Sequence, residues 1–286
     1  MSSPVHTAKE TGCLYLVATP IGNLEDVTLR ALRVLKEVDL IACEDTRQTQ
    51  KLLNHYGIRK RLVSYHEHNE MTRAPEVVIE LEQGARVALV SDAGMPVISD
   101  PGHRLVTLCL RHHIPIVPLP GASALVAALA ASGMSTEGFL FVGFLPSRAG
   151  ERRKVLEELA AQPRTLVLYE APHRVEDTLK DALDILGPRP AVIAREVTKV
   201  HEEFLRGSLP ELLEQMRRKA PRGEMTLLIG PGPRQGPAAT DVPLTKRIEQ
   251  LMREQKVDHK TALKQAARER GLTKREAYKR LLIERR

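Results

Sequence analysis

Short apolar runs alternate with amphipathic stretches along the first part of the chain. Strand-length runs rich in Val, Ile and Leu stand at 14–18, 40–43, 62–65, 86–91 and 116–119. Between them, apolar residues recur with helical spacing at 27–38, 46–56, 74–83 and 103–112. Such alternation predicts a parallel or mostly parallel sheet that helices cover on both faces. We therefore expect an N-terminal α/β lobe over residues 12–119.

A second series of alternating elements follows Pro118, Pro120 and Gly121. A helix is expected at 122–131, and strand-like runs follow at 139–144, 165–169, 191–196, 203–206 and 225–229. Helical stretches at 151–161, 173–186 and 209–219 separate these runs. We expect a second α/β lobe over residues 120–232, with some antiparallel pairing.

Beyond the second lobe, the chain changes in character. The stretch 231–239 is dense in Pro and Gly, which predicts a linker over 233–243. Three short helices are expected at 244–254, 260–270 and 274–283, forming a small domain over 244–286, with Gly271 and Thr273 as caps. The last pair resembles a helix-turn-helix, a shape that also occurs in bundles that bind nothing.

The positive charge of the chain is concentrated in this C-terminal segment. The net charge is +7, but residues 243–286, here called the basic tail, hold 14 Lys and Arg against 6 Asp and Glu. This leaves 29 against 30 for residues 1–242. A basic segment on a nearly neutral body fits a polyanionic partner, because phosphate contacts release counterions. A solvated helical tail remains the alternative interpretation.

Several classes of protein are disfavoured by what the sequence lacks. No apolar run is long enough to span a membrane and residues 1–12 contain no apolar stretch, so we expect a cytoplasmic protein. Cys13, Cys43 and Cys109 are widely spaced, and His66 and His68 lack the helical zinc spacing, so no metal site is expected. The first strand runs into ATPIGN at 18–23, without the glycine fingerprint of NAD or FAD enzymes, and no Walker loop is present.

The most unusual segment is SDAGMPVISDPG at 91–102. It follows an expected parallel strand, and ligands of open α/β sheets bind at the carboxyl ends of such strands. Its small residues allow backbone amides to touch a ligand, while Asp92 and Asp100 can face a polar group. We interpret this loop as part of a binding site.

Five motifs occur in order along the two expected lobes. They read TPIGNL at 19–24, EDTR at 44–47, the 91–102 loop, PLPGAS at 118–123 and YEAPHR at 169–174. Over residues 12–230 the chain resembles the ribosomal RNA small subunit methyltransferase I family, which belongs to the tetrapyrrole-methylase-like, or class III, S-adenosylmethionine-dependent methyltransferases. The basic tail is also similar.

The resemblance implies a two-lobed fold with S-adenosylmethionine in the cleft between the lobes, and a homodimer. It implies 2′-O-ribose methylation of a cytidine in small-subunit (16S) ribosomal RNA, as naked RNA or in the assembled small subunit. The residues that match the family's cofactor contacts are Pro20, Asp92, Ala93, Gly94, Met95, Pro96, Ile98, Ser123, Tyr169, Glu224, Met225 and Thr226.

Methyl transfer to a ribose hydroxyl makes modest chemical demands. The enzyme must bring the oxygen to about 3 Å from the methyl carbon and align them, and no metal is needed. A base, or a cation that stabilises the developing alkoxide, would help. The candidates at expected strand ends are Asp45, Asp100, Glu170, Glu196 and Lys199. We favour Lys199 as the cation and Glu170 as the proton acceptor.

Other charged residues near the same strand ends are candidates for holding RNA. Guanidinium groups bind phosphate or base edges with two hydrogen bonds, so we assign Arg47, Arg174 and Arg195, with Asp45, to the substrate. Surface salt bridges are the alternative for each arginine. With five Tyr, four Phe and no Trp, the chain cannot build a wide aromatic platform for single-stranded bases.

Two other functions remain open. One is a methyltransferase of the same fold that acts on a tetrapyrrole or a protein side chain, although such substrates do not need a basic tail. The other is a non-catalytic RNA-binding assembly factor, in which the 91–102 loop would be hard to explain.

Overall fold

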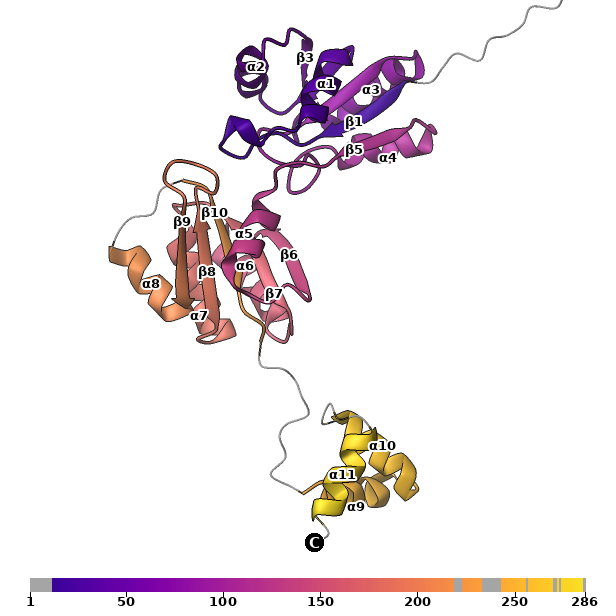
Figure 1. Ribbon diagram of the computed structural model, residues 1–286, viewed down its shortest axis with the longest axis vertical. Coiled ribbons are helices and arrows are strands. Elements are labelled where there is room, and N and C mark those ends of the chain that lie inside the picture. The colour runs from indigo at the N-terminus through magenta and orange to yellow at the C-terminus, as the bar shows by residue number, and fades with distance from the viewer. Residues whose placement is uncertain are drawn as a thin grey trace, which may run out of the picture.

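The computed structural model describes residues 12–218, 223–232, 243–255, 257–269, 272 and 274–284. They form two α/β lobes followed by three helices (Figure 1). The first lobe has five strands, β1 (Cys13–Val17), β2 (Leu40–Cys43), β3 (Arg61–Ser64), β4 (Arg86–Val90) and β5 (Ile116–Leu119). All pairs are parallel, in the order β3-β2-β4-β1-β5. The predicted parallel sheet is confirmed.

Helices cover both faces of this sheet because its strands are apolar on both sides. Helices α1 (Leu29–Glu37) and α2 (Thr46–His55) pack on the face that carries Ala88 and Val90 of β4. Helices α3 (Glu70–Glu82) and α4 (His103–Arg111) pack on the face that carries Val87 and Leu89. The carboxyl ends of β1, β2 and β4 therefore meet at one edge, where their loops are free to form a site. A short 3₁₀ turn, η1 (Leu24–Asp26), follows β1.

Helix α3 begins four residues before its predicted start at Ala74. The side chain of Asn69 organises the preceding turn: its Oδ1 accepts from the His66 N–H at 2.9 Å, and its Nδ2 donates to the Ser64 carbonyl at 3.1 Å. This turn starts the helix at Glu70 and leaves Pro75 inside it. Pro75 is the sixth residue of the helix, so it removes the hydrogen bond to the carbonyl of residue 71 and its ring crowds that carbonyl.

The second lobe holds a mixed sheet. Its strands are β6 (Phe139–Phe144), β7 (Thr165–Glu170), β8 (Pro190–Arg195), β9 (Glu203–Ser208) and β10 (Met225–Ile229), in the order β6-β7-β10-β8-β9. Only the β6–β7 pair is parallel, so the expected antiparallel pairing is present. Helices α6 (Ala149–Leu159), α7 (Val175–Leu186) and α8 (Leu209–Arg218) cover one face, and α5 (Ala124–Ser132) covers the other.

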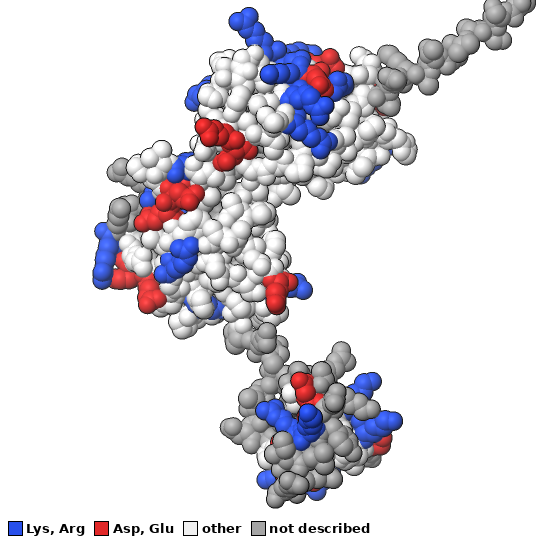
Figure 2. Space-filling model, viewed as in Figure 1, with Lys and Arg blue, Asp and Glu red and all other residues white. Residues whose placement is uncertain are grey.

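The basic tail folds around its own apolar core. Helices α9 (Leu244–Gln255), α10 (His259–Glu269) and α11 (Lys274–Glu284) bury Leu244, Ile248, Leu251, Ala262, Ala266, Ala277 and Leu281. Lys and Arg side chains project from its visible surface (Figure 2). The predicted caps Gly271 and Thr273 and the linker residues 233–242 lie outside the described residues.

Two features are absent from the described residues. Within these ranges, no helix is both long enough and apolar enough to cross a membrane. In the same part of the chain, no group of three or more His, Cys, Asp or Glu side chains could hold a metal ion.

Candidate functional site

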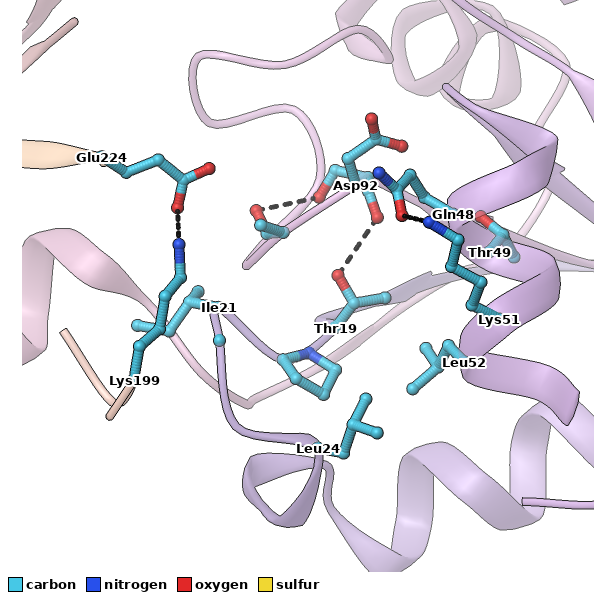
Figure 3. A pocket seen from close by; sticks show the side chains of 14 residues that line it. Thr19, Ile21, Leu24, Gln48, Thr49, Lys51, Leu52, Asp92, Lys199 and Glu224 are labelled. Atoms are coloured by element: carbon cyan, nitrogen blue, oxygen red, sulfur yellow. Dashed lines mark hydrogen bonds and ion pairs between the residues drawn. The ribbon is translucent and has the colours of Figure 1, made fainter. Parts of the chain in front are cut away.

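A cavity of about 450 Å³ opens at the carboxyl edge of the first sheet, and side chains of both lobes line it (Figure 3). The first lobe contributes the loop after β1, one face of α2 and the loop after β4. The second lobe contributes Lys199 and Glu224. The full lining is Thr19, Pro20, Ile21, Gly22, Leu24, Gln48, Thr49, Lys51, Leu52, Ser91, Asp92, Ala93, Lys199 and Glu224.

The floor of the cavity is fixed by bonds between the loops after β1 and β4. Thr19 and Gly94 exchange two backbone hydrogen bonds of 2.9 and 3.0 Å, and Thr19 Oγ1 donates to the Ser91 carbonyl at 3.1 Å. In the same loop, Val97 and Ser99 adopt positive φ values of 77° and 64°. This conformation is costly for a β-branched residue and persists only where the surroundings hold it, as happens at ligand sites.

Asp45 and Arg47 form one unit at the start of α2. Asp45 Oδ1 caps the helix by accepting from the Arg47 N–H at 2.8 Å, and the Arg47 guanidinium donates to Asp45 Oδ2 at 2.7 Å. These hydrogen bonds lower the pKa of Asp45 to about 2. The Asp45 N–H donates to Asp92 Oδ1 at 3.0 Å, which joins this unit to the loop after β4. The Arg47 side chain is 86% exposed, so solvent reaches its guanidinium while Asp45 holds it in place.

Asp100 lies further along the loop after β4 in a protected position. Burial raises its pKa to about 7, and the negative charges of Glu44 and Asp92 add to the effect, whereas a hydrogen bond with Ser91 opposes it. Burial also raises the pKa of Tyr169 on β7, whose hydroxyl accepts from the Leu125 N–H at 3.3 Å. The first lobe thus carries a carboxyl group that titrates near neutral pH.

Lys199 enters the cavity from the second lobe and is held by two carboxylates. Its Nζ donates to Glu196 Oε1 at 2.9 Å and to Glu224 Oε2 at 3.0 Å. Burial works to lower the pKa of Lys199, but these two hydrogen bonds outweigh burial and raise it. Glu196 Oε1 also accepts from the Glu224 N–H at 3.0 Å. Lys199 is therefore a positioned ammonium group.

The segment around Lys199 also contacts the first lobe directly. The Asn23 N–H donates to Thr198 Oγ1 at 3.2 Å. A Cβ atom added to Gly22 would lie 2.4 Å from Lys199 Cγ, so the backbone of the first lobe passes against the lysine stem. The two lobes meet where the cavity lies.

The surroundings of Glu170 do not favour the proton-accepting role that we expected. The residue is 3% exposed, Oε1 accepts from the Ala171 N–H at 2.8 Å, and Oε2 accepts from Thr178 Oγ1 at 2.6 Å. The guanidinium of Arg174 lies 3.5 Å from Oε1. Both carboxylate oxygens are engaged inside the second lobe, so the geometry favours a structural role for Glu170.

Two of the arginines assigned to RNA also have partners within the protein. Arg174 Nη2 donates to the carbonyl oxygens of Leu145 and Pro146 at 2.6 and 3.2 Å. Arg195 Nη2 donates to Glu203 Oε2 at 2.7 Å, across the β8–β9 pair. The alternative that we weighed for each arginine was a surface salt bridge, and Arg47 with Asp45 and Arg195 with Glu203 each form an ion pair of 2.7 Å. Of the three, Arg47 has the most exposed side chain, 86%, although its guanidinium is paired with Asp45.

The expected cofactor residues fall into two groups. Pro20, Asp92, Ala93 and Glu224 line the cavity. The others are not among the lining residues: Gly94, Met95, Pro96 and Ile98 continue the loop after β4, Ser123 precedes α5, and Tyr169 pairs with Thr226 beside Met225 on β10.

Sequence reasoning missed the wall that α2 gives to the cavity. Gln48, Lys51 and Leu52 lie at i, i+3 and i+4, so they share one face of the helix. Because α2 starts in the EDTR motif at the cavity edge, this spacing carried a usable signal. Leu24 was also missed, and it lies in the 3₁₀ turn that no pattern had indicated.

Comparison with known proteins agrees with this architecture. The family model for Tetrapyrrole (Corrin/Porphyrin) Methylases matches residues 13–213. Solved structures share the fold. The methyltransferase CobJ has a TM-score of 0.60 and 20% identity, over 77% of this chain and 95% of that chain. Uroporphyrin-III C-methyl transferase from Thermus thermophilus complexed with S-adenyl homocysteine has a TM-score of 0.55 and 24% identity, over 77% of this chain and 97% of that chain.

Curated relatives are much closer in sequence. Ribosomal RNA small subunit methyltransferase I of Halalkalibacterium halodurans is 50% identical over 277 residues, which cover 94% of each chain. The protein of the same name from Thermotoga maritima is 50% identical over 218 residues, which cover 76% of this chain and 98% of that protein. These matches confirm the resemblance seen in the motifs. The chain belongs to the tetrapyrrole methylase family, within its ribosomal RNA small subunit methyltransferase I group.

Proposed function

We propose that this protein transfers the methyl group of S-adenosylmethionine to the 2′-hydroxyl of a cytidine in small-subunit ribosomal RNA. The observation that carries the proposal is the match, 50% identical over 94% of the chain, to a relative named for ribosomal RNA methylation. The cavity between the lobes gives this activity a place, because it joins a rigid binding loop to a positioned ammonium group.

The residues at the lobe junction suit this cofactor. Ala93 and Gly94 leave the backbone of the loop after β4 open to a ligand, and the positive φ values of Val97 and Ser99 support a loop that its surroundings hold in place. The Asp92 carboxylate suits a cation, and S-adenosylmethionine supplies a positively charged sulfonium that carries the methyl group. We propose as cofactor contacts Pro20, Asp92, Ala93, Gly94, Met95, Pro96, Ile98, Ser123, Tyr169, Glu224, Met225 and Thr226.

We assign the stabilisation of charge on the ribose oxygen to Lys199. The ribose oxygen bonds to the methyl carbon, the carbon–sulfur bond breaks to leave a neutral thioether, and the hydroxyl proton passes to water. An ammonium group fixed beside the oxygen stabilises its negative character and needs no rearrangement at that moment. Glu196 and Glu224 fix the ammonium at 2.9 and 3.0 Å. Arg47, exposed at the start of α2, is the assigned contact for RNA phosphate, with Asp45 holding its guanidinium.

The proposal also covers the domains of the chain, its oligomeric state and its location in the cell. Residues 12–119 and 120–232 form the two lobes, 233–243 the linker, and 244–286 a domain that docks on ribosomal RNA or on the assembled small subunit. The protein works as a homodimer in the cytoplasm, and light scattering of the purified chain tests the dimer.

The experiment that tests the proposal measures transfer of labelled methyl from S-adenosylmethionine to small ribosomal subunits and to naked ribosomal RNA. We expect label in RNA, located by nuclease digestion at one cytidine whose 2′-oxygen carries the methyl group. Cofactor binding without label in either RNA form would contradict the assigned substrate. Tetrapyrroles and protein side chains would then be the substrates to test.

A further inference from the structure

The cavity has one wall to which the proposed reaction gives no role. The loop after β4, Pro20 and Glu224 are assigned to the cofactor, and Lys199 to the ribose oxygen. Across from Lys199 and Glu224 stands the face of α2 that carries Gln48, Lys51 and Leu52 (Figure 3). Thr19 and Asp92 lie between the two sides.

The α2 wall presents polar groups of both kinds. Gln48 Oε1 accepts from Lys51 Nζ at 3.1 Å, so the amide and the ammonium lie side by side. A glutamine amide offers a carbonyl acceptor and two N–H donors, and a lysine adds further donors. Leu24 and Leu52 supply apolar surface beside them. This combination suits a flat ring that has a polar edge.

A nucleobase is such a ring, and it needs only part of a cavity that the cofactor shares. The cavity volume of about 450 Å³ lies within the range of roughly 300–1,000 Å³ found for small-molecule sites. Enzymes that must reach a buried nucleotide turn it out of its stack, and proteins read the exposed base by its Watson–Crick edge. Lys199 and the α2 wall line the same cavity, so a nucleotide whose ribose lies at Lys199 can direct its base toward α2.

Resting on the function proposed above, we propose that the α2 wall binds the base of the target nucleotide, with Gln48 and Lys51 as residues that determine specificity for cytosine. Cytosine offers an amino donor next to two acceptors, N3 and O2. Gln48 Oε1 accepts from the amino group, while the Gln48 amide N–H and Lys51 Nζ donate to the acceptors. Uracil presents a carbonyl in place of the amino group, which sets two acceptors against each other.

The test compares Gln48→Ala with Gln50→Ala in the full chain. Gln50 is a matched control because it is the same residue on the same helix, lies outside the cavity lining and donates to Asn54 Oδ1 at 2.8 Å. The substrates are small subunits rebuilt with RNA that carries cytidine or uridine at the mapped site. The readouts are kcat/KM on each substrate, the Kd for S-adenosylmethionine and the thermal unfolding midpoint.

We expect Gln48→Ala to lower kcat/KM on cytidine by about 10- to 100-fold, the discrimination that a good pair of hydrogen bonds to a base carries. The preference for cytidine over uridine should narrow, while cofactor affinity, the unfolding midpoint and every value for Gln50→Ala stay near those of the natural chain. Gln48→Glu keeps an acceptor for the amino group and should retain part of the preference.

Three results would overturn the inference, and they differ in what else they affect. An unchanged preference for cytidine in Gln48→Ala removes the base-reading role and leaves the proposed function intact. A loss of cofactor affinity in Gln48→Ala, matched by the loss in kcat/KM, assigns the α2 wall to the cofactor instead. Failure of the natural chain to methylate either substrate overturns the proposed function together with the inference.

Discussion

At the scale of single residues, a variant at Glu170 can distinguish a structural role of this carboxylate from a catalytic one. Its carboxylate accepts hydrogen bonds from the buried Thr178 hydroxyl and from the Ala171 N–H, so Glu170→Ala leaves both donors without an acceptor. We expect the free energy of unfolding in urea to fall by about 2–3 kcal/mol, with a smaller loss, about 1 kcal/mol, for Thr178→Val. A variant that keeps full stability but loses turnover by more than about 100-fold would restore the role of proton acceptor.

Asp100 gives the protein a pH dependence whose sign can be stated. Its pKa is raised from 3.8 to about 7, so the folded protein binds a proton that the unfolded chain has released in this pH range. The contribution of this group to the free energy of unfolding is therefore full below about pH 4 and is lost as the pH rises through about 7.

Replacing Asp100 by Asn removes this dependence. The gain in the free energy of unfolding from Asp100→Asn should be about 1–2 kcal/mol larger at about pH 8 than at about pH 5, because burial disfavours the ionised carboxylate that asparagine replaces. Solvent screens part of this burial cost, which keeps the difference modest. Urea unfolding at the two pH values measures the difference. Asp26→Asn, at an exposed position on the 3₁₀ turn, is the control and should show none. An equal gain at both pH values would mean that Asp100 is ionised throughout.

The sequence located the binding loop but not the duties of every residue near it. Asp92 and Pro20 follow parallel strands, and strand ends converge whatever the tertiary detail, so their place in the cavity was predictable. The hydrogen bonds of Glu170 within the protein were not predictable, because one of them comes from the hydroxyl of Thr178, eight residues away, which burial brings into contact.

At the scale of elements, one buried ion pair joins α6 to α7. Arg152 Nη2 lies 2.7 Å from Asp181 Oδ2, with side chains 5% and 11% exposed, whereas its neighbour Arg153, 40% exposed, pairs with Asp181 from the surface. We expect Arg152→Ala to lower the free energy of unfolding by about 2–4 kcal/mol, and Arg153→Ala by less than about 1 kcal/mol. Urea unfolding measures both, and equal losses would contradict the difference in burial.

The contact between the lobes gives a prediction about turnover. A methyl group at Gly22 would meet Lys199 Cγ at 2.4 Å and Thr198 Oγ1 at 2.9 Å, so Gly22→Ala must displace the lysine from the carboxylates that hold it. We expect kcat to fall by about 10-fold or more, because a small misplacement of a catalytic group has a large effect. Gly150→Ala on α6, whose added Cβ would meet nothing within 4 Å, is the control. Unchanged turnover in Gly22→Ala would remove Lys199 from the reaction.

Most elements were predictable to within a residue or two because their apolar period is strong. The strands at 40–43, 116–119, 139–144 and 225–229 match the structure in full. The order β7-β10-β8 was not predictable, since β10 is the last strand along the chain and inserts between two earlier ones. Such pairing depends on contacts between distant segments, which a local pattern does not encode.

At the scale of the whole molecule, the excess of positive charge and a separate apolar core both belong to the basic tail. The basic tail carries a net +8, from 14 Lys and Arg against 6 Asp and Glu, and folds around its own core. The matched part of the Thermotoga maritima relative, 218 residues, takes in 98% of that protein, which leaves no room for both lobes and a tail. We therefore propose that methyl transfer belongs to the lobes and that the tail adds affinity for a polyanion.

Removing the tail should change binding without changing chemistry. For a chain that ends at Gly232, we expect an unchanged Kd for S-adenosylmethionine and a near-natural kcat at saturating subunits. KM for subunits should rise by about 10-fold or more, and log(kcat/KM) should fall less steeply with log salt, because fewer phosphate contacts release counterions. The full chain with Lys260, Lys264 and Lys279 changed to Gln keeps the tail but removes three exposed charges, so its salt slope should lie between the two. If truncation leaves both KM and the salt slope unaltered, the tail is a solvated appendage and the lobes alone recognise the RNA.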